Sequence, residues 1–331
     1  MTSLLERKLL VVTGKGGVGR TTIASAIGLL AADRGLRTLV VEVSNQDRVP
    51  ELFGLAAQGP GVETELREGL WSLSVDPDRA LLEWLQVLGG RVSGRLLASS
   101  STFQYFTAAA PGAKELISMV KIWELTQSKR WHGRAVGYDL VLLDAPATGH
   151  ALGMLQSPRT FRAIARVGPI AAQAQQVQAL LQDPRRCGYL GVAQGTEMAV
   201  RETVELDAGL RRELDRGLHA VIVNAVLPQR FTGAELARLA QLSDGVRAQR
   251  APTPGSRPRR ASDSLTRSAT LAARAVHQRA RYQHNQIARL RRRRFQVVSI
   301  PFQFGAELDL SVRVRRDWRA DDGLLDRLGI N

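Results

Sequence analysis

Residues 8–24, KLLVVTGKGGVGRTTIA, decide the fold of this chain. The apolar run at 8–13 predicts a buried strand, and the apolar spacing after residue 20 predicts a helix. The glycines between them let successive backbone N–H groups point inward, and the helix adds the positive end of its dipole. The stretch therefore predicts a phosphate-binding loop between the first strand and the first helix. The alternative is a glycine-rich turn that only reverses the chain.

A loop of this kind predicts a bound nucleotide, ATP, together with Mg²⁺. Thr21 stands where the hydroxyl of such a loop ligates Mg²⁺, and Thr22 is close enough to reach an α-phosphate. Arg20 occupies the place of the usual lysine, and a planar guanidinium replaces a compact ammonium poorly, so we expect binding with slowed hydrolysis. The nucleotide-binding residues predicted here are Gly14, Lys15, Gly16, Gly17, Val18, Gly19, Arg20, Thr21 and Thr22.

Further apolar runs separated by longer amphipathic segments continue to the other end of the chain. Continuous rather than alternating hydrophobicity is typical of strands that are covered on both faces. The sequence therefore predicts an α/β fold with a doubly wound, mostly parallel sheet in a single domain over 1–331. The other strands are expected at 38–43, 70–75, 140–144, 189–193, 218–223 and 296–300.

Three segments differ from this pattern. Residues 77–130 lack a convincing strand and predict a helical insert, whose apolar residues form either an ordinary helix core or an apolar groove. Residues 243–261 are rich in Pro, Gly, Ser and Arg, which predicts a flexible linker. Residues 262–295 predict a basic helical segment.

The net charge of +15 over 331 residues comes largely from one part of the chain. Residues 245–294 contain 14 Arg and a single acid, Asp263. Such a segment attracts anionic lipid or nucleic acid, or it is a solvated surface helix. Aromatic residues are nearly absent from it, so nucleic acid is the less favoured partner.

Composition also bears on location. The apolar fraction is 44%, and we find neither the roughly 18 uncharged apolar residues of a spanning helix nor a signal peptide at the start. We therefore expect a cytoplasmic protein, with a peripheral site at the inner face of the membrane as the alternative.

Lys15, the second residue of the loop motif, gives the loop a specific resemblance. It is similar to the deviant Walker A loop of the SIMIBI-type ATPases, which include the MinD, ParA and ArsA proteins. In those families the signature lysine reaches across a dimer to the phosphates of the partner. The resemblance implies that Lys15 is catalytic and that the protein acts as a dimer.

The stretch after the strand at 140–144 narrows the resemblance further. The strand ends in Asp144, where a carboxylate would hold Mg²⁺ through water. The next residues, APATGH at 145–150, resemble the DTAPTGH signature of the ArsA family, which implies that Thr148, Gly149 and His150 are switch residues. By the same resemblance, Asn224 contacts adenine and Pro301 lies near the base.

The chain departs from the family pattern after its second strand. Ser44 falls where the family has the aspartate that orients the attacking water, and serine is a poor general base. Either Glu42 or Asp47 takes that role, or hydrolysis is weak; we predict Glu42 as the catalytic carboxylate. Cys187 is the only cysteine, so neither the zinc clasp of the tail-anchor targeting branch nor a cysteine site for arsenite is expected.

The sequence thus predicts an ArsA-like ATPase that binds Mg²⁺ and ATP at a dimer interface. The dimer is either a homodimer or a heterodimer with a paralogue, and its nucleotide state is coupled to a membrane protein, a membrane surface or another protein partner. Two alternatives stay open. One is a positioning ATPase similar to ParA or MinD, and the other is a partner subunit that carries nucleotide without hydrolysing it.

Overall fold

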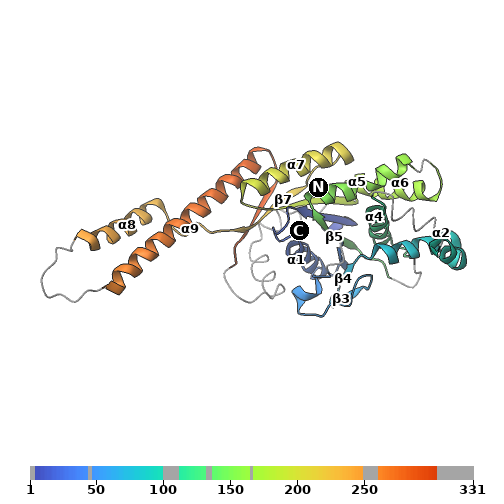
Figure 1. Cartoon of the computed structure of the whole chain (residues 1–331), viewed down its shortest axis with the longest axis horizontal. Coiled ribbons are helices and arrows are strands. Elements are labelled where there is room, and N and C mark those ends of the chain that lie inside the picture. Colours follow the sequence, from blue (N-terminus) through green and yellow to red (C-terminus); the bar gives the residue numbers. More distant parts are fainter. Residues whose placement is uncertain are drawn as a thin grey trace.

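The strands form one sheet in the order β3-β4-β2-β5-β1-β6-β7-β8 (Figure 1). All neighbouring strands are parallel except β3, which pairs antiparallel with β4 at one edge. The strands are β1 (Leu9–Gly14), β2 (Thr38–Glu42), β3 (Thr64–Arg67), β4 (Leu70–Ser74), β5 (Leu140–Ala147), β6 (Cys187–Gln194), β7 (Ala220–Val226) and β8 (Val297–Pro301). This computed structural model describes residues 4–43, 47–99, 112–131, 136–164, 167–248 and 260–303.

Helices cover both faces of the sheet. The α-helices are α1 (Arg20–Ala32), α2 (Pro77–Ser99), α4 (Ala113–Leu125), α5 (Thr148–Ile164), α6 (Pro169–Gln182), α7 (Glu197–Leu214), α8 (Gly233–Ala248) and α9 (Arg260–Arg292). Two short 3-10 helices are η1 (Leu4–Glu6) and η2 (Pro50–Phe53). The predicted doubly wound, mostly parallel α/β architecture is therefore confirmed.

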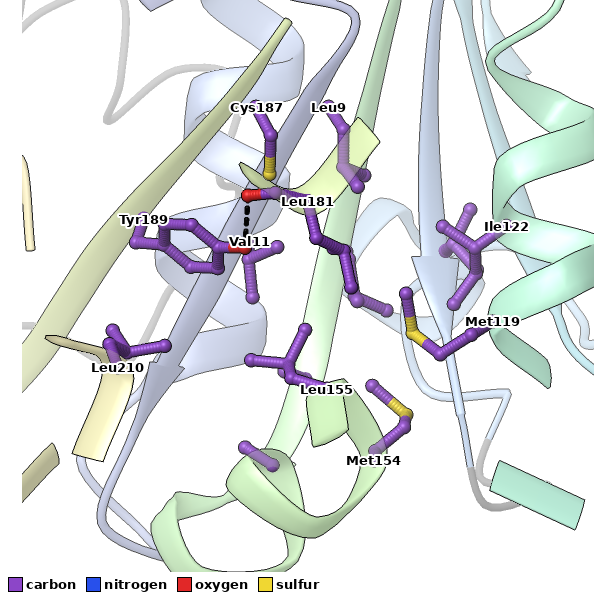
Figure 2. Packing of buried hydrophobic residues seen from close by; sticks show 14 of the residues in the cluster. Leu9, Val11, Met119, Ile122, Met154, Leu155, Leu181, Cys187, Tyr189 and Leu210 are labelled. Carbon is purple, nitrogen blue, oxygen red and sulfur yellow. Dashed lines mark hydrogen bonds between the residues drawn. The ribbon is translucent and has the colours of Figure 1, made fainter. Parts of the chain in front are cut away.

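Alternation along β1 explains why the strand is apolar throughout. Leu9 and Val11 pack into one core layer with α4, α5, α6 and α7, whereas Leu10 and Val12 pack into the other layer with α1. Figure 2 shows the first layer, where the fully buried Tyr189 donates its hydroxyl to the carbonyl of Leu181 at 2.9 Å. A strand buried on both faces reads as a continuous apolar run.

The edge strand β3 was not predicted from the sequence. It is short, and its sequence TELR alternates between buried and more exposed positions. Such an edge strand has polar residues on its solvent side, so it lacks the continuous apolar run that marks the central strands. The register shift between Glu65 and Arg67 shortens its pairing with β4 further.

The region predicted as a helical insert holds α2 and α4. The apolar residues of α4, among them Leu116, Met119 and Ile122, are buried against the sheet, which favours the ordinary helix core over a groove. Residues 100–111, which include Phe103, Tyr105 and Phe106 of this apolar region, lie outside the described residues.

A buried ion cluster connects this region to the edge of the sheet. Lys121 Nζ lies 2.7 Å from Glu83 Oε2 and 3.0 Å from Glu124 Oε2. Arg130 lies 2.6 Å from Glu124 Oε1 and 2.8 Å from Glu63 Oε1. Charges taken out of water in this way need all their partners. The cluster therefore ties α2 and α4 to the chain segment that leads into β3.

The helices α8 and α9 pack against each other and project to the left of the sheet in Figure 1. The second half of α9 returns to the body of the protein, where it contacts α7, β7 and β8. Among the described residues, every helix is too short or too polar to span a membrane.

The predicted linker begins earlier than the structure supports. Helix α8 continues through residues 243–248, since the first proline of this stretch is Pro252 and Gly245 alone costs a helix only about 1 kcal/mol. Residues 249–259 lie outside the described residues, and α9 begins at Arg260.

Candidate functional site

The phosphate-binding loop lies between the end of β1 and the start of α1, in the middle of the sheet. The geometry requires glycine at both ends of this loop. A Cβ at Gly14 would clash with the carbonyl oxygen of Val192 on β6, and Gly19 has φ +92° with the Asn224 side chain against it. The loop therefore packs closely against β6 and the end of β7, which fix its backbone conformation.

A cavity of about 540 Å³ opens in front of this loop, a volume within the usual range for small-molecule sites. It is bounded by the loop on one side and by the carboxyl ends of β2 and β5 on the other. This is the edge of a parallel sheet at which ligands bind. Its lining residues are Gly17, Gly19, Arg20, Thr21, Thr22, Glu42, Val43, Arg48, Glu51, Leu52, Asp144, Ala145, Pro146 and Ala147.

Asp144 and Thr21 meet at the floor of the cavity. The Thr21 hydroxyl donates to Asp144 Oδ2 at 2.5 Å, and Asp144 Oδ1 is buried without a hydrogen-bond partner among the described residues. Burial raises the pKa of Asp144, against the opposing effects of the Thr21 hydrogen bond and of nearby Arg20 and Arg48. A buried carboxylate oxygen without a partner is costly, so this oxygen is suited to a cation.

This pair fits Mg²⁺, which prefers oxygen ligands and is usually held by one or two protein groups together with substrate phosphates. Among the described residues, no group of three or more His, Cys, Asp and Glu side chains is arranged to hold a metal ion without such help. Thr21 and Asp144 thus provide a partial set of ligands that a phosphate would complete.

Arg20 points away from the loop, toward β5. Its guanidinium donates to the carbonyl oxygen of Ala145. Burial lowers the pKa of Arg20, and the neighbouring charge of Asp144 partly offsets this effect. One arm of the guanidinium is therefore engaged by the protein at the position where the usual loop has a lysine.

Glu42 is bound by the loop that follows its own strand. Its Oε1 accepts the backbone N–H of Arg48 and its Oε2 accepts the N–H of Val49, each at 3.0 Å. Burial raises the pKa of Glu42, while these two hydrogen bonds lower it. Both carboxylate oxygens of the residue that we predicted as the catalytic carboxylate are thus already occupied.

The alternative carboxylate is also engaged. Asp47 is buried, has φ +36°, and accepts the N–H of Gly59 through Oδ2 at 2.9 Å. Ser44 lies outside the described residues. Glu42 and Asp47, the two carboxylates considered for the general base, therefore both already accept backbone N–H groups.

Lys15 contacts its own chain. Its ammonium lies 2.7 Å from Glu202 Oε1 on α7 and also touches the sulfur of Met198. Each of the two charged side chains is 31% exposed, so the pair is at the surface rather than inside the cavity. In this conformation Lys15 does not line the cavity.

Asn224 and Pro301 lie on neighbouring strands beside the loop. The Asn224 amide donates to the carbonyl of Val18 at 2.9 Å, and its oxygen accepts the N–H of Ala225 at 2.9 Å. Pro301 ends β8 and is exposed. Asn224 thus touches the phosphate-binding loop itself.

The predicted switch residues follow β5 directly. Helix α5 begins at Thr148, whose hydroxyl oxygen is buried without a partner among the described residues. His150 is exposed and lines a second cavity of about 440 Å³, which shares Val43 and Pro146 with the first. A shift at the start of α5 would therefore reach both cavities.

Sequence reasoning missed several groups at this site. Arg48 and Glu51 line the cavity, and Glu202 binds Lys15. Arg48 lies in the loop after β2 and Glu51 in the short helix η2, and neither stretch has a motif of its own. Glu202 is 187 residues from Lys15 along the chain, so no local pattern brings the two together.

Comparison with known proteins finds a family and relatives that are named as ATPases. The family described as anion-transporting ATPase, ArsA, matches residues 7–167. The ATPase BagA of Mycobacterium tuberculosis is 32% identical over 251 residues, which are 73% of this chain and 72% of that protein. An arsenical pump-driving ATPase of Halobacterium salinarum is 25% identical over 68% of this chain and 36% of its own length. The ATPase GET3 of Paracoccidioides lutzii is 26% identical over 52% of this chain and 50% of its own.

Proposed function

This chain belongs to the ArsA family of ATPases, and we propose that it binds Mg²⁺ and ATP in the cavity in front of the phosphate-binding loop. The observation that carries the proposal is the pair formed by Thr21 and Asp144, with one buried oxygen of Asp144 left without a partner. When Mg²⁺ is bound, it neutralises phosphate charge and polarises the terminal phosphate.

The loop residues divide the work of binding. The backbone N–H groups from Gly16 to Gly19 face the phosphates, and the N-terminus of α1 adds its positive dipole. Thr21 and Asp144 hold the cation, and Thr22 contacts the α-phosphate. Asn224 contacts adenine, with Pro301 near the base; for this the amide uses its second hydrogen or leaves the carbonyl of Val18.

Hydrolysis is proposed to be slow. A general base needs a free oxygen within reach of the attacking water, and both oxygens of Glu42 accept backbone N–H groups. For Glu42 to act as the base, the loop after β2 would first have to release it. Arg20, in the place of a lysine, directs one arm of its guanidinium to Ala145 instead of to phosphate.

We further propose that the active form is a dimer, either of two copies or with a paralogue. In that form Lys15 leaves Glu202 and reaches the phosphates bound by the partner. Thr148, Gly149 and His150 change position with nucleotide state and pass the change to a protein or membrane partner. The protein would act in the cytoplasm or at the inner face of the membrane.

Calorimetry with ATP in the presence of Mg²⁺ or of EDTA, followed by phosphate release, tests the proposal. We expect Mg²⁺-dependent binding and turnover that is slow for the chain alone and faster with the right partner. Absence of binding at millimolar ATP and Mg²⁺ would refute it. The variant Asp144→Asn should lose this Mg²⁺ dependence. Its matched control is Asp139→Asn, because Asp139 is exposed and directly precedes β5, the strand that carries Asp144.

The same measurements separate a second candidate, a partner subunit that binds nucleotide without hydrolysing it. The occupied Glu42 and the engaged Arg20 favour this candidate. Tight Mg²⁺-dependent binding with no phosphate release, alone or in complex with a paralogue, would select it.

A further inference from the structure

Helix α9 carries four exposed arginines in one row, Arg267, Arg274, Arg281 and Arg292, which we call the arginine row. The first three follow one another at intervals of seven residues, about two helical turns, and the last follows after eleven residues, about three turns. All four side chains therefore leave the helix on nearly the same side. At about 1.5 Å per residue, the row extends over about 37 Å.

The arginine row is not neutralised by the protein. None of its four members makes an ion pair with another described residue, and Asp263 is the only acid in α9. The arginines of α7 show the opposite arrangement. Arg201, Arg211 and Arg212 each lie 2.7 to 2.8 Å from an acidic oxygen of the same helix, on Glu205, Asp207 and Glu213. An exposed row without partners attracts an anionic surface, whereas paired arginines do not.

Exposed apolar side chains stand beside this charge. Leu271 is 60% exposed and lies one turn from both Arg267 and Arg274. Tyr282, which follows Arg281, is 44% exposed. Apolar and aromatic side chains among arginines suit the boundary between lipid headgroups and acyl chains.

We infer that the arginine row docks on the surface of a bilayer that contains anionic lipid. The row is straight and lies on one side of a long helix, so all four guanidiniums reach a flat surface together. The inference does not depend on the proposed ATPase function, because the row lies outside the residues that line the nucleotide cavity.

Double-stranded nucleic acid fits the row less well. Helix α8 packs along α9, and two helices of about 10–12 Å each are wider than the major groove of about 12 Å. Tyr282 is the only aromatic residue of α9, and its hydroxyl accepts the N–H of Glu197 at 3.2 Å. A single aromatic side chain is no platform for stacked bases.

The test is sedimentation of the full-length protein, without nucleotide, with phosphatidylcholine vesicles that do or do not contain phosphatidylglycerol. We expect binding only to the anionic vesicles, and its loss at high salt. Neutralising three arginines in R267Q/R274Q/R281Q should weaken partitioning about 100-fold, at about fivefold for each arginine. The single variant R274Q should weaken it about fivefold.

The matched control is R201Q/R211Q/R212Q, which removes the same charge from exposed positions of α7. It should change partitioning less than about twofold, because those arginines are already paired. No binding to anionic vesicles at low salt, or an equal loss in both triple variants, would overturn the inference. So would duplex DNA binding that is tighter than vesicle binding and is lost in the row variant, since it would assign the row to nucleic acid. Circular dichroism of each variant confirms that the helices are intact.

Discussion

The ends of β2 and β5 lie side by side, and each carries a carboxylate at the same register position, on the buried Glu42 and the half-buried Asp144. Glu42 pairs with Asp144 across the two strands. The loop after β2 fills both oxygens of Glu42, whereas Asp144 has one oxygen on Thr21 and the other without a partner among the described residues. Burial raises the pKa of both groups. Of these two neighbouring carboxylates, Glu42 thus has a backbone partner on each oxygen, whereas Asp144 keeps one open oxygen.

The difference shows which carboxylate the protein keeps for a ligand. Hydrogen bonds to backbone N–H groups stabilise the charge of Glu42 and fix the loop, so this group is an anchor. Asp144 depends on one hydroxyl and on nearby arginines, and its free oxygen is satisfied only when a cation arrives. Lys15 resembles Glu42 in this respect, because its ammonium already has a partner in Glu202.

The largest effect is expected from Asp144→Asn. The amide has no charge for a cation, so Mg²⁺-dependent turnover should fall about 1000-fold. Without ligand, the free energy of unfolding should stay the same or rise slightly, because a buried charge is removed. Phosphate release with Mg²⁺ or EDTA measures turnover, urea unfolding without ligand measures the free energy of unfolding, and Asp139→Asn is the control. Persistent Mg²⁺-dependent turnover in Asp144→Asn would mean that the open carboxylate is not the ligand.

Acidification should weaken the same site. Since the pKa of Asp144 is raised, the carboxyl group takes up a proton at a higher pH than an ordinary aspartate does. Mg²⁺-dependent ATP affinity should therefore fall by up to about tenfold per pH unit below that pKa. The free energy of unfolding of the unliganded protein should instead rise on acidification. A folded-state pKa above the unfolded value contributes stability at low pH that is lost as the pH rises through the folded pKa. Calorimetry and denaturant unfolding across pH, with Asp144→Asn as the insensitive control, test both signs.

Arg20→Lys should speed turnover by about tenfold, because a compact ammonium can turn from β5 to the phosphates. The guanidinium in the native chain is directed to the carbonyl of Ala145, next to the open carboxylate. Single-turnover phosphate release measures the change. A slower variant would show that the guanidinium itself serves the reaction.

Glu42→Gln tests whether Glu42, which has a backbone partner on each oxygen, is an anchor or the general base. The amide has one oxygen, so the N–H of either Arg48 or Val49 loses its acceptor, at a cost of about 1–3 kcal/mol in the free energy of unfolding. Turnover should fall less than about tenfold, since general-base catalysis would be worth at least about 100-fold. Urea unfolding with the exposed Glu115→Gln as control measures the first effect. A turnover loss above 100-fold with unchanged stability would make Glu42 the base.

The smallest effect is expected from Glu202→Gln, which frees Lys15. The pair is partly exposed, so it contributes only about 0.2–1 kcal/mol. ATP affinity or dimer formation should rise by at most about fivefold, as measured by calorimetry and sedimentation. Glu205→Gln on the same helix, whose partner is Arg201, is the control and should change neither quantity.

The sequence predicted the central strands and the position of the phosphate-binding loop because these depend on local patterns. Continuous apolar runs identified β1 and β5, and the glycines between β1 and α1 identified the loop. The edge strand β3 has no such run, and the start of the linker was set too early because α8 continues to Ala248. The partners of Glu42 and Lys15 are set by a loop conformation and by a tertiary contact, respectively, so no local sequence pattern shows them.

The ion cluster of Glu63, Glu83, Lys121, Glu124 and Arg130, of which the last three are buried, limits how this protein can diverge. Losing one of the buried members, Lys121, Glu124 or Arg130, leaves a charge without its partner in the interior, which costs about 3–5 kcal/mol, a large part of the stability of a typical domain. Replacing all of them with apolar residues of similar volume is often neutral. During evolution, the contact between α2, α4 and the sheet edge can therefore become apolar only if several members of the cluster are substituted together.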